Sequence, residues 1–438
     1  MLHQMQSGHT PLQFGIRENI QQVAHQLVQV FMVGLTLGMM RTVIPALAEQ
    51  EFGVPRGSFM LLTAFVVAFG FVKGILNFVA GRWSERIGRK SVLLLGWAAA
   101  IPIPFMILYA PNWDWIVAAT ILLGVNQGFT WSMTQTAKLD ITLANQRGFT
   151  LGLNEFSGYV GVALAGILTG YLAMMWGPRM GLFVFGVVVI GVATVMTAFW
   201  VRETLAWAHA PHKSQSNIAN GLPRYPKNIV DTPNTWEIFT LMSWRDRRMA
   251  SFCQAGLVEK FVDALVWVVL PVYFYQRNVA LTEIGWIVGI YGFVWGGAQF
   301  FTGRLSDHIG RKKPIVGGMW LCGSGVAMTL LGNGVVWWSL SAAITGLGMA
   351  LLYPNLSAAV ADIAHPQWRG SAIGIYRFWR DLGYGIGALM LGAIAGWTGL
   401  LENAIWLTAI AMGLSGAVVW YWGEETHPLI HPADKTPS

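Results

Sequence analysis

The stretch Gly81-Arg-Trp-Ser-Glu-Arg-Ile-Gly-Arg-Lys90 returns as Gly303-Arg-Leu-Ser-Asp-His-Ile-Gly-Arg-Lys312, 222 residues later in a chain of 438. Long apolar runs flank both copies. A repeat spaced by about half the chain indicates an internal duplication. The two copies therefore predict a duplicated membrane protein.

The composition indicates the same class of protein. Hydrophobic residues make up 54% of the chain and charged residues 11%, whereas soluble domains carry about 25% charged residues. The basic residues lie in short loops between apolar runs rather than on one soluble face, so nucleic acid is not expected as a partner. Cys253 and Cys322 match no disulfide or metal spacing. No phosphate-binding loop or nucleophile motif is present, so we expect no metal, no cofactor and no enzymatic activity.

Twelve apolar runs approach the roughly 20 residues that cross a bilayer. Only helices satisfy their own backbone hydrogen bonds in single spans of this kind. The sequence therefore predicts an all-α integral membrane protein with twelve transmembrane helices in two six-helix pseudo-repeat bundles. The runs lie near residues 26–48, 58–79, 91–110, 114–137, 150–175, 179–201, 250–275, 281–302, 314–333, 336–360, 371–397 and 402–422.

Basic residues predict the orientation. With both termini inside, twenty of the 28 lysines and arginines face the cytoplasm and three face outside, as the positive-inside rule requires. The expected divisions are a cytoplasmic segment over 1–25, bundles over 26–201 and 250–422, a cytoplasmic linker over 202–249 and a cytoplasmic tail over 423–438. Residues 235–244 of the linker suit a short helix on the inner membrane surface or, equally, a flexible tether. No signal peptide precedes the first span, which we expect to direct insertion.

The two Gly-x-x-Ser-Asp/Glu-x-x-Gly-Arg-Lys loops resemble the signature loops of the major facilitator superfamily, between helices two and three and between helices eight and nine. The resemblance covers residues 20–425 and implies a gradient-driven solute transporter whose bundles rock around a central cavity. It implies no particular substrate. Where the family's drug exporters carry an arginine in helix four, this chain has Gly124, and the fifth-helix motif at 161–170 lacks its proline. Drug/proton exchange is therefore not indicated.

The polar pattern at the cytoplasmic helix ends repeats at the same offset, for example Glu203 with Glu425. Such groups can form charge-assisted bonds and helix-end contacts. A network present only when the cytoplasmic side is closed would bias the two-state equilibrium; the alternative is that these residues only set orientation. The expected gating set is Gly81, Glu85, Arg86, Gly88, Arg89, Lys90, Asp140, Arg147, Glu203, Gly303, Asp307, Gly310, Arg311, Asp362, Arg369 and Glu425.

Charges inside the predicted spans must be paired or face water, because an unpaired one costs roughly 2.5–3.5 kcal/mol at the helix centre. Five bases, which include Lys73 and Lys260, nearly balance four acids, and this balance favours mutual pairing. The expected substrate and coupling-ion residues are Arg41, Glu155, Glu259, Asp263, Arg377, Arg380 and Asp381, with Asn126, Gln127, Trp131, Gln135, Tyr353 and Asn355 as uncharged cavity candidates.

Repeat-equivalent positions suggest two pairs across the halves, Arg41 with Asp263 and Glu155 with Arg377. The alternative is pairing within one bundle, as between Lys260 and Asp263. Glu259 and Asp263 share one helix face, and we expect the proton site at one of them.

These features predict a secondary active transporter that moves a small solute by alternating access, coupled to a proton or ion gradient. We expect a multi-pass monomer in a bacterial plasma (inner) membrane, surrounded by lipid. Two alternatives stay open. One is a non-transporting receptor on the same scaffold, and the other is a drug or metabolite exporter.

Overall fold

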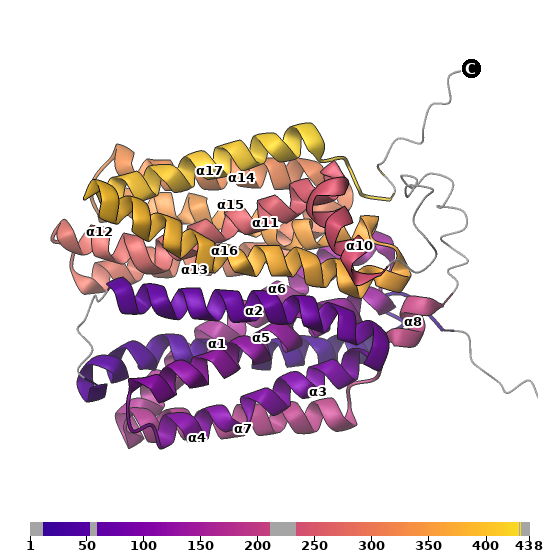
Figure 1. The fold of residues 1–438 in the computed structure, drawn as a ribbon, viewed down its shortest axis with the longest axis horizontal. Helices are drawn as coiled ribbons and strands as arrows, with labels where there is room; N and C mark the ends of the chain where they lie inside the picture. The colour runs from indigo at the N-terminus through magenta and orange to yellow at the C-terminus, as the bar shows by residue number, and fades with distance from the viewer. Residues whose placement is uncertain (1–11, 53–58, 211–233, 429, 431–438) are drawn as a thin grey trace, which may run out of the picture.

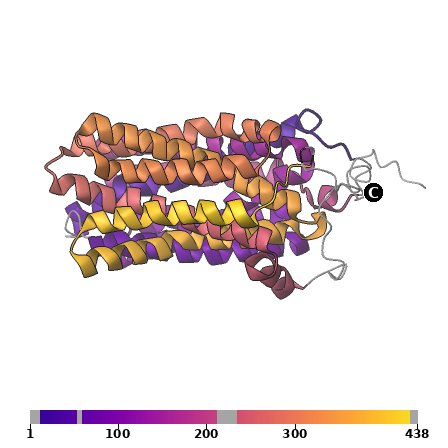
Figure 2. The same cartoon turned by 90° about the horizontal axis from the view of Figure 1, so that it is seen from above.

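The computed structural model describes residues 12–52, 59–210, 234–428 and 430, without the side chains of 41–50, 59–66 and 281–282. Long helices run side by side and form two layers, the N-terminal half against the C-terminal half (Figure 1). Each half is held largely by its own hydrophobic core. Figure 2 shows the same helices aligned along the long axis of the molecule.

Within the described residues, seven α-helices form the N-terminal bundle. The third predicted span is divided at Ile101 because Pro102 begins a new helix. The helices are α1 Ile20–Phe52, α2 Phe59–Ile87, α3 Arg89–Ala100, α4 Pro102–Leu108, α5 Trp113–Ile141, α6 Arg147–Trp176 and α7 Pro178–Phe199.

The C-terminal half repeats this arrangement. Its first span passes through a π-helical segment, Leu265–Val269, just before Pro271, where the missing proline N–H disturbs the regular ladder. The helices are α11 Arg247–Ala264, α12 Leu270–Gln276, α13 Leu281–Ile309, α14 Lys312–Leu331, α15 Val335–Ile363, α16 Arg369–Thr398 and α17 Leu401–Trp422.

The predicted all-α, two-bundle fold is confirmed. Every predicted apolar run coincides with a helix or a helix pair, which is consistent with twelve spans. Among the described residues, nine helices are long and apolar enough to cross a membrane. Helices α11 and α16 are not among these nine, because each carries charges of the central cluster described below.

The halves meet along two glycine-lined helix pairs, α2 with α16 and α6 with α13 (Figure 1). A Cβ added at Gly81 would lie 2.9 Å from the Cα of Gly374, and one at Gly152 would lie 3.3 Å from the Cα of Gly303. Small residues let membrane helices approach this closely. The expected gating glycines Gly81 and Gly303 therefore lie at the contact between the halves.

The end of the linker is helical, as one of the two interpretations expected. Asn234 caps α10, Thr235–Thr240, in a capping box with Glu237, and a π-helical turn, Leu241–Arg245, follows. The ring of Phe239 lies 5.7 Å from those of Phe78 on α2 and Phe378 on α16. The linker helix therefore packs on both halves at the end of the molecule where α8, Leu205–His209, also lies (Figure 1).

Gly310 ends α13 with φ of 93°, a conformation that side chains rarely adopt, and a Cβ there would collide with the Glu425 carboxylate. Gly310→Ala should therefore destabilise the protein by about 1–3 kcal/mol. Thermal unfolding in detergent measures the change. The matched control is Gly317→Ala within α14, where a Cβ meets open space and alanine favours the helix by about 1 kcal/mol. Equal melting temperatures for the two variants would contradict this account.

Candidate functional site

The signature loop of each half forms hydrogen bonds with two other segments of the same half. In the N-terminal half, Arg89 Nε donates to Asp140 Oδ2 at 2.9 Å, and Glu203 accepts from the backbone N–H groups of Arg89 and Lys90 at 2.8 and 3.0 Å. The C-terminal half repeats these bonds. Arg311 Nε donates to Asp362 Oδ2 at 3.1 Å, and Glu425 accepts from the backbone N–H groups of Arg311 and Lys312 at 2.7 and 3.1 Å.

Other members of the expected gating set join the two halves. Glu85 accepts from the backbone N and the Oγ of Ser371 at 2.6 and 2.7 Å. Asp307 accepts from the backbone N of Gly148 and of Phe149 at 3.0 and 2.8 Å. Each carboxylate thus caps the first turn of a helix in the opposite half, where it also complements the helix dipole.

A buried ion pair adds a third connection, since Arg147 Nη1 lies 2.7 Å from Asp362 Oδ1. These bonds hold the signature-loop end of the two halves together, and that end is the one the sequence assigns to the cytoplasm. Within the expected set, four side chains bridge the halves, namely Glu85, Arg147, Asp307 and Asp362. Five act inside one half, namely Arg89, Asp140, Glu203, Arg311 and Glu425. Lys90 Nζ donates to the Ala198 carbonyl, Arg86 is exposed and Arg369 is buried.

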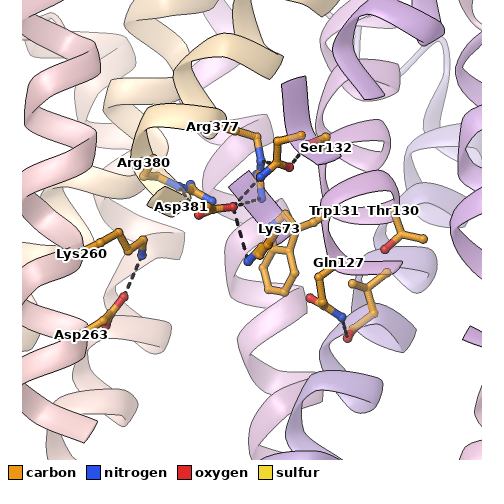
Figure 3. Close-up of polar contacts among 12 residues, drawn as sticks. Lys73, Gln127, Thr130, Trp131, Ser132, Lys260, Asp263, Arg377, Arg380 and Asp381 are labelled. Carbon is orange, nitrogen blue, oxygen red and sulfur yellow. Dashed lines mark hydrogen bonds and ion pairs between the residues drawn. The ribbon is translucent and has the colours of Figure 1, made fainter. Parts of the chain in front are cut away.

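Midway along the helices, a second cluster of buried charges centres on Asp381 of α16 (Figure 3). Asn77 Nδ2 donates to Asp381 at 2.6 Å, and Arg380 Nε donates to it at 3.1 Å. The ammonium nitrogen of Lys73, on α2 of the other half, lies 3.6 Å away. Arg377 Nη2 lies at 3.8 Å. One carboxylate therefore faces three cations and links the halves.

A chain of hydrogen bonds leads from this centre to Glu155 on α6. Arg377 donates through Nε to Asn77 at 3.2 Å and through Nη1 to Gln135 at 2.9 Å. Gln135 Nε2 then donates to Glu155 at 2.5 Å. Trp131 and Asn154 donate to the same Glu155 oxygen at 2.8 and 2.9 Å. The expected pair of Glu155 and Arg377 is thus connected through Gln135.

The acids of α11 have unlike surroundings. Asp263 accepts from Lys260 at 2.8 Å and from Tyr291 Oη at 2.7 Å. Glu259 is fully buried, and its nearest cation is the Lys260 ammonium at 3.9 Å. No hydrogen bond to either Glu259 oxygen comes from the described residues. Asp263 is therefore held in place by hydrogen bonds, whereas Glu259 is not.

Aromatic rings from both halves adjoin these charges. The Lys260 ammonium lies 3.8 Å from the ring centre of Tyr353, and the Arg380 guanidinium lies 4.6 Å from it. The ring centre of Trp295 lies 4.9 Å from that of Tyr353 and 4.2 Å from that of Tyr159. We call this set of buried charges and rings the central cluster; it comprises Lys73, Asn77, Trp131, Gln135, Glu155, Tyr159, Glu259, Lys260, Asp263, Tyr291, Trp295, Tyr353, Tyr376, Arg377, Arg380, Asp381 and Tyr384.

Not every residue expected at a substrate site lies here. Asn126 and Gln127 donate to the carbonyls of Gly96 and Val33 inside the N-terminal half, and Asn355 donates to the Leu351 carbonyl of its own helix. The side chain of Arg41 lies outside the described residues. The structure does bring together Trp131, Glu155, Glu259, Asp263, Tyr353, Arg377, Arg380 and Asp381.

Sequence reasoning missed Asn77, Tyr159, Tyr291, Trp295, Tyr376 and Tyr384. For Asn77 a signal existed, because it follows Lys73 by one helical turn and shares its face. Lys138 is one of the twenty basic residues that the sequence analysis assigned to inner loops, and this is corrected. It lies buried in the last turn of α5 and donates to the Gln26 carbonyl at 3.3 Å. The apolar run ends before Lys138, but the helix continues beneath other helices.

Two bundles joined around a buried polar cluster define a membrane transporter, and comparison with known proteins agrees. The sequence profile of the Major Facilitator Superfamily matches residues 27–258 and 252–437. The chain therefore belongs to this superfamily, and it is a transporter rather than an enzyme. Among the described residues, no three His, Cys, Asp or Glu side chains gather as a metal site would require.

Curated relatives share about a fifth of their residues with this chain over most of its length. An uncharacterised transporter of the same type from Salmonella typhimurium is 21% identical, with 89% of this chain and 93% of the relative covered. The class E tetracycline resistance protein of Escherichia coli is 22% identical, with 88% of this chain and 92% of that protein covered. The proton-coupled antiporter flippase LtaA of Staphylococcus saprophyticus is 24% identical (88% and 90%). None of these three is named as a receptor.

Solved structures share the fold. The human organic anion transporter MFSD10 superposes with a TM-score of 0.73 at 14% identity, covering 92% of this chain and 99% of that one. The proton:xylose symporter XylE superposes with a TM-score of 0.72 at 14% identity, covering 94% and 98%. At this identity the likeness concerns the fold alone.

Proposed function

We propose that this chain carries a small solute across the plasma membrane by alternating access, and that Glu259 takes up and releases a proton during each cycle. Two of the similar proteins support a proton-driven cycle: the relative LtaA is named a proton-coupled antiporter, and XylE, which shares the fold, is named a proton symporter. The distribution of basic residues supports cytoplasmic termini. The protein is proposed to act as a monomer in a bacterial inner membrane.

The observation that carries the proposal is the difference among the four buried acids of the central cluster. Asp381 and Asp263 each face cations at hydrogen-bonding distance, and Glu155 accepts three hydrogen bonds. Glu259 accepts none from the described residues. A buried carboxylate without donors is costly as an ion and far less costly as the neutral acid. Glu259 is therefore the acid that can exchange a proton without dismantling the cluster.

The position of the cluster supports coupling to the movement of the halves. Lys73 and Asn77 come from one half, and their partner Asp381 comes from the other. Rocking of the halves must change these contacts, because they cross the seam. A solute bound between the halves would thus contact the same charges that respond to a proton on Glu259.

Glu259→Gln should abolish proton movement while preserving solute exchange, because glutamine imitates the neutral acid but binds no proton. Proteoliposomes that contain a pH-sensitive dye report proton entry when a solute is added. Counterflow of labelled solute measures exchange without net proton movement. We expect solute-evoked acidification to fall to the level of empty liposomes, while counterflow stays near the wild-type rate.

The matched control is Glu237→Gln, which removes an exposed carboxylate from the linker helix α10. It should retain both activities. Wild-type acidification by Glu259→Gln protein would show that another group carries the proton, and the proposal would then be wrong.

A further inference from the structure

Two guanidinium groups of the central cluster each have a nitrogen that donates no hydrogen bond to the described residues. Arg380 Nη1 makes no hydrogen bond with any described residue, nor does Arg377 Nη2, whose nearest acid oxygen is at 3.8 Å. Both side chains are buried, with exposed fractions of 1% and 0%. An unpaired charged donor inside a protein is costly. Arginine suits recognition of planar oxyanions, because its N–H groups form a rigid fork. The spare donors therefore favour an anionic group as ligand.

The charges of the central cluster set the number of negative charges that it can accept. Its four cations are Lys73, Lys260, Arg377 and Arg380, and three of its acids hold hydrogen bonds to nearby groups. With Glu259 ionised the cluster is neutral, and with Glu259 protonated it carries one excess positive charge. A monovalent anion is therefore favoured when Glu259 holds a proton.

The ionisable groups around Glu259 support this count. Its own helix contributes one cation and one acid, already paired with each other. Arg380, on α16, lies close to α11: a Cβ added at Gly256 of α11 would lie only 3.3 Å from the Cβ of Arg380. The ionisable groups that interact electrostatically with Glu259 are Lys260 and Asp263 on α11, Tyr291 on α13, Cys322 on α14, and Tyr376, Arg380 and Asp381 on α16.

Aromatic rings lie beside the guanidinium donors that have no partner. Tyr353 lies against the Arg380 guanidinium, and Trp295, Tyr159 and Trp131 continue the ring contacts into the N-terminal half. Trp295 Nε1 has no hydrogen-bond partner among the described residues. Pockets lined by rings with a few polar groups bind apolar bodies and orient them by those groups. The body of the ligand should therefore be aromatic or otherwise apolar.

We infer that the central cluster binds a monovalent organic acid with an apolar body, its carboxylate on Arg380 and Arg377, and that this anion and the Glu259 proton bind together. The inference rests on the proposed function and adds the class of solute and the reason why solute and proton move in the same direction. Because linkage is reciprocal, an anion that binds better when Glu259 is protonated must increase proton binding equally. The cycle is then a symport of proton and acid.

A series of matched ligands tests the charge preference. Thermal unfolding of the purified full chain is measured with naphthoate, naphthamide and naphthylmethylamine, which share a ring system but are anionic, neutral and cationic. Benzoate and decanoate, each with its amide, extend the size range. We expect at least one acid to raise the melting temperature and its amide not to do so. A larger shift by the amine, or no advantage of any acid over its amide, would overturn the inference.

Two arginine variants locate the acid. Arg380→Gln should lose the acid-induced shift, and Arg380→Lys, which keeps the charge that Asp381 needs, should weaken it. The control is Arg277→Gln, where the arginine pairs with Glu402 on the surface. It should keep the full shift. An unchanged shift in folded Arg380→Lys and Arg380→Gln proteins would place the acid elsewhere and contradict the inference.

Calorimetry tests the coupling. Titration of the acid in two buffers of different ionisation enthalpy, at a pH alkaline enough to ionise Glu259 in the free protein, gives the number of protons taken up. This number should be near one for wild type and near zero for Glu259→Gln. Proton release on binding would mean competition and would overturn the symport. The proposed function and this inference can fail independently. Acids that bind with proton uptake but are never transported would refute the proposed function and leave the binding inference intact. Glu259-dependent transport of a neutral solute would refute only the inference.

Discussion

Asp381→Asn should destabilise the protein more than any other single change in the central cluster. The carboxylate faces Arg380, Lys73 and Arg377 in a site with no exposed surface. Asparagine keeps the size but removes the charge, so three cations would be left to repel one another. Removing one partner of a buried ion pair costs about 3–5 kcal/mol. Melting temperature in detergent, followed by tryptophan fluorescence, measures the loss.

Two comparisons separate this effect from general damage. Glu402→Gln removes an acid from a half-exposed surface pair with Arg277, which should cost about 0–1 kcal/mol. Adding Lys73→Met to Asp381→Asn removes one unpaired cation and should recover part of the lost stability, so the two changes should be non-additive. Additive effects, or an Asp381→Asn loss no larger than that of Glu402→Gln, would mean that Asp381 does not hold the cluster together.

The second large effect concerns the contacts between the halves at the signature-loop end. Combining Glu85→Gln with Asp307→Asn should shift the resting population toward a form open at this end, because both acids cap helices of the opposite half. Hydrogen bonds to charged groups contribute about 1.5–3 kcal/mol each. Losing several of them can invert an equilibrium between two forms separated by a few kcal/mol.

Ile87 and Ile309 are exposed residues at equivalent ends of α2 and α13. Spin labels at these two positions, in a protein without Cys253 and Cys322, measure the opening as a longer distance between the labels. Arg89→Gln and Glu203→Gln should also favour the open form, but less, because these residues act within one half. Glu237→Gln should leave the distance unchanged. If the double variant shows the wild-type distance, these loops serve orientation rather than gating.

Periodicity and repetition carried most of the prediction of the fold. Each apolar run long enough to cross a bilayer had to become a helix, because no water is present there to satisfy the backbone. The repeat of the signature loop then related the two halves. Pro102 and Pro271 altered the regularity of two spans without changing their number, since neighbouring helices support the backbone at both places.

The candidate site was predicted only in part. Intramembrane charges such as Glu155 and Arg380 were conspicuous because they are costly in lipid, and the structure brings them together. Their partners were not predictable from spacing. Asp263 pairs with Lys260 and Tyr291, the within-bundle alternative, and Gln135 stands between Glu155 and Arg377.

The sequence by itself determined which segments are apolar enough to cross the membrane, that the chain is duplicated, and which charged residues interrupt the apolar runs. It could do so because hydropathy, chain length and repeat spacing are properties of the chain taken in order. Only the tertiary structure decided that Glu85 and Asp307 reach across the seam while Arg89 and Glu203 do not. It alone distinguished Glu259, without a hydrogen-bond donor among the described residues, from three acids that have them. Hydrogen bonds depend on separations of about 3 Å between atoms on different helices, and no sequence spacing specifies those distances.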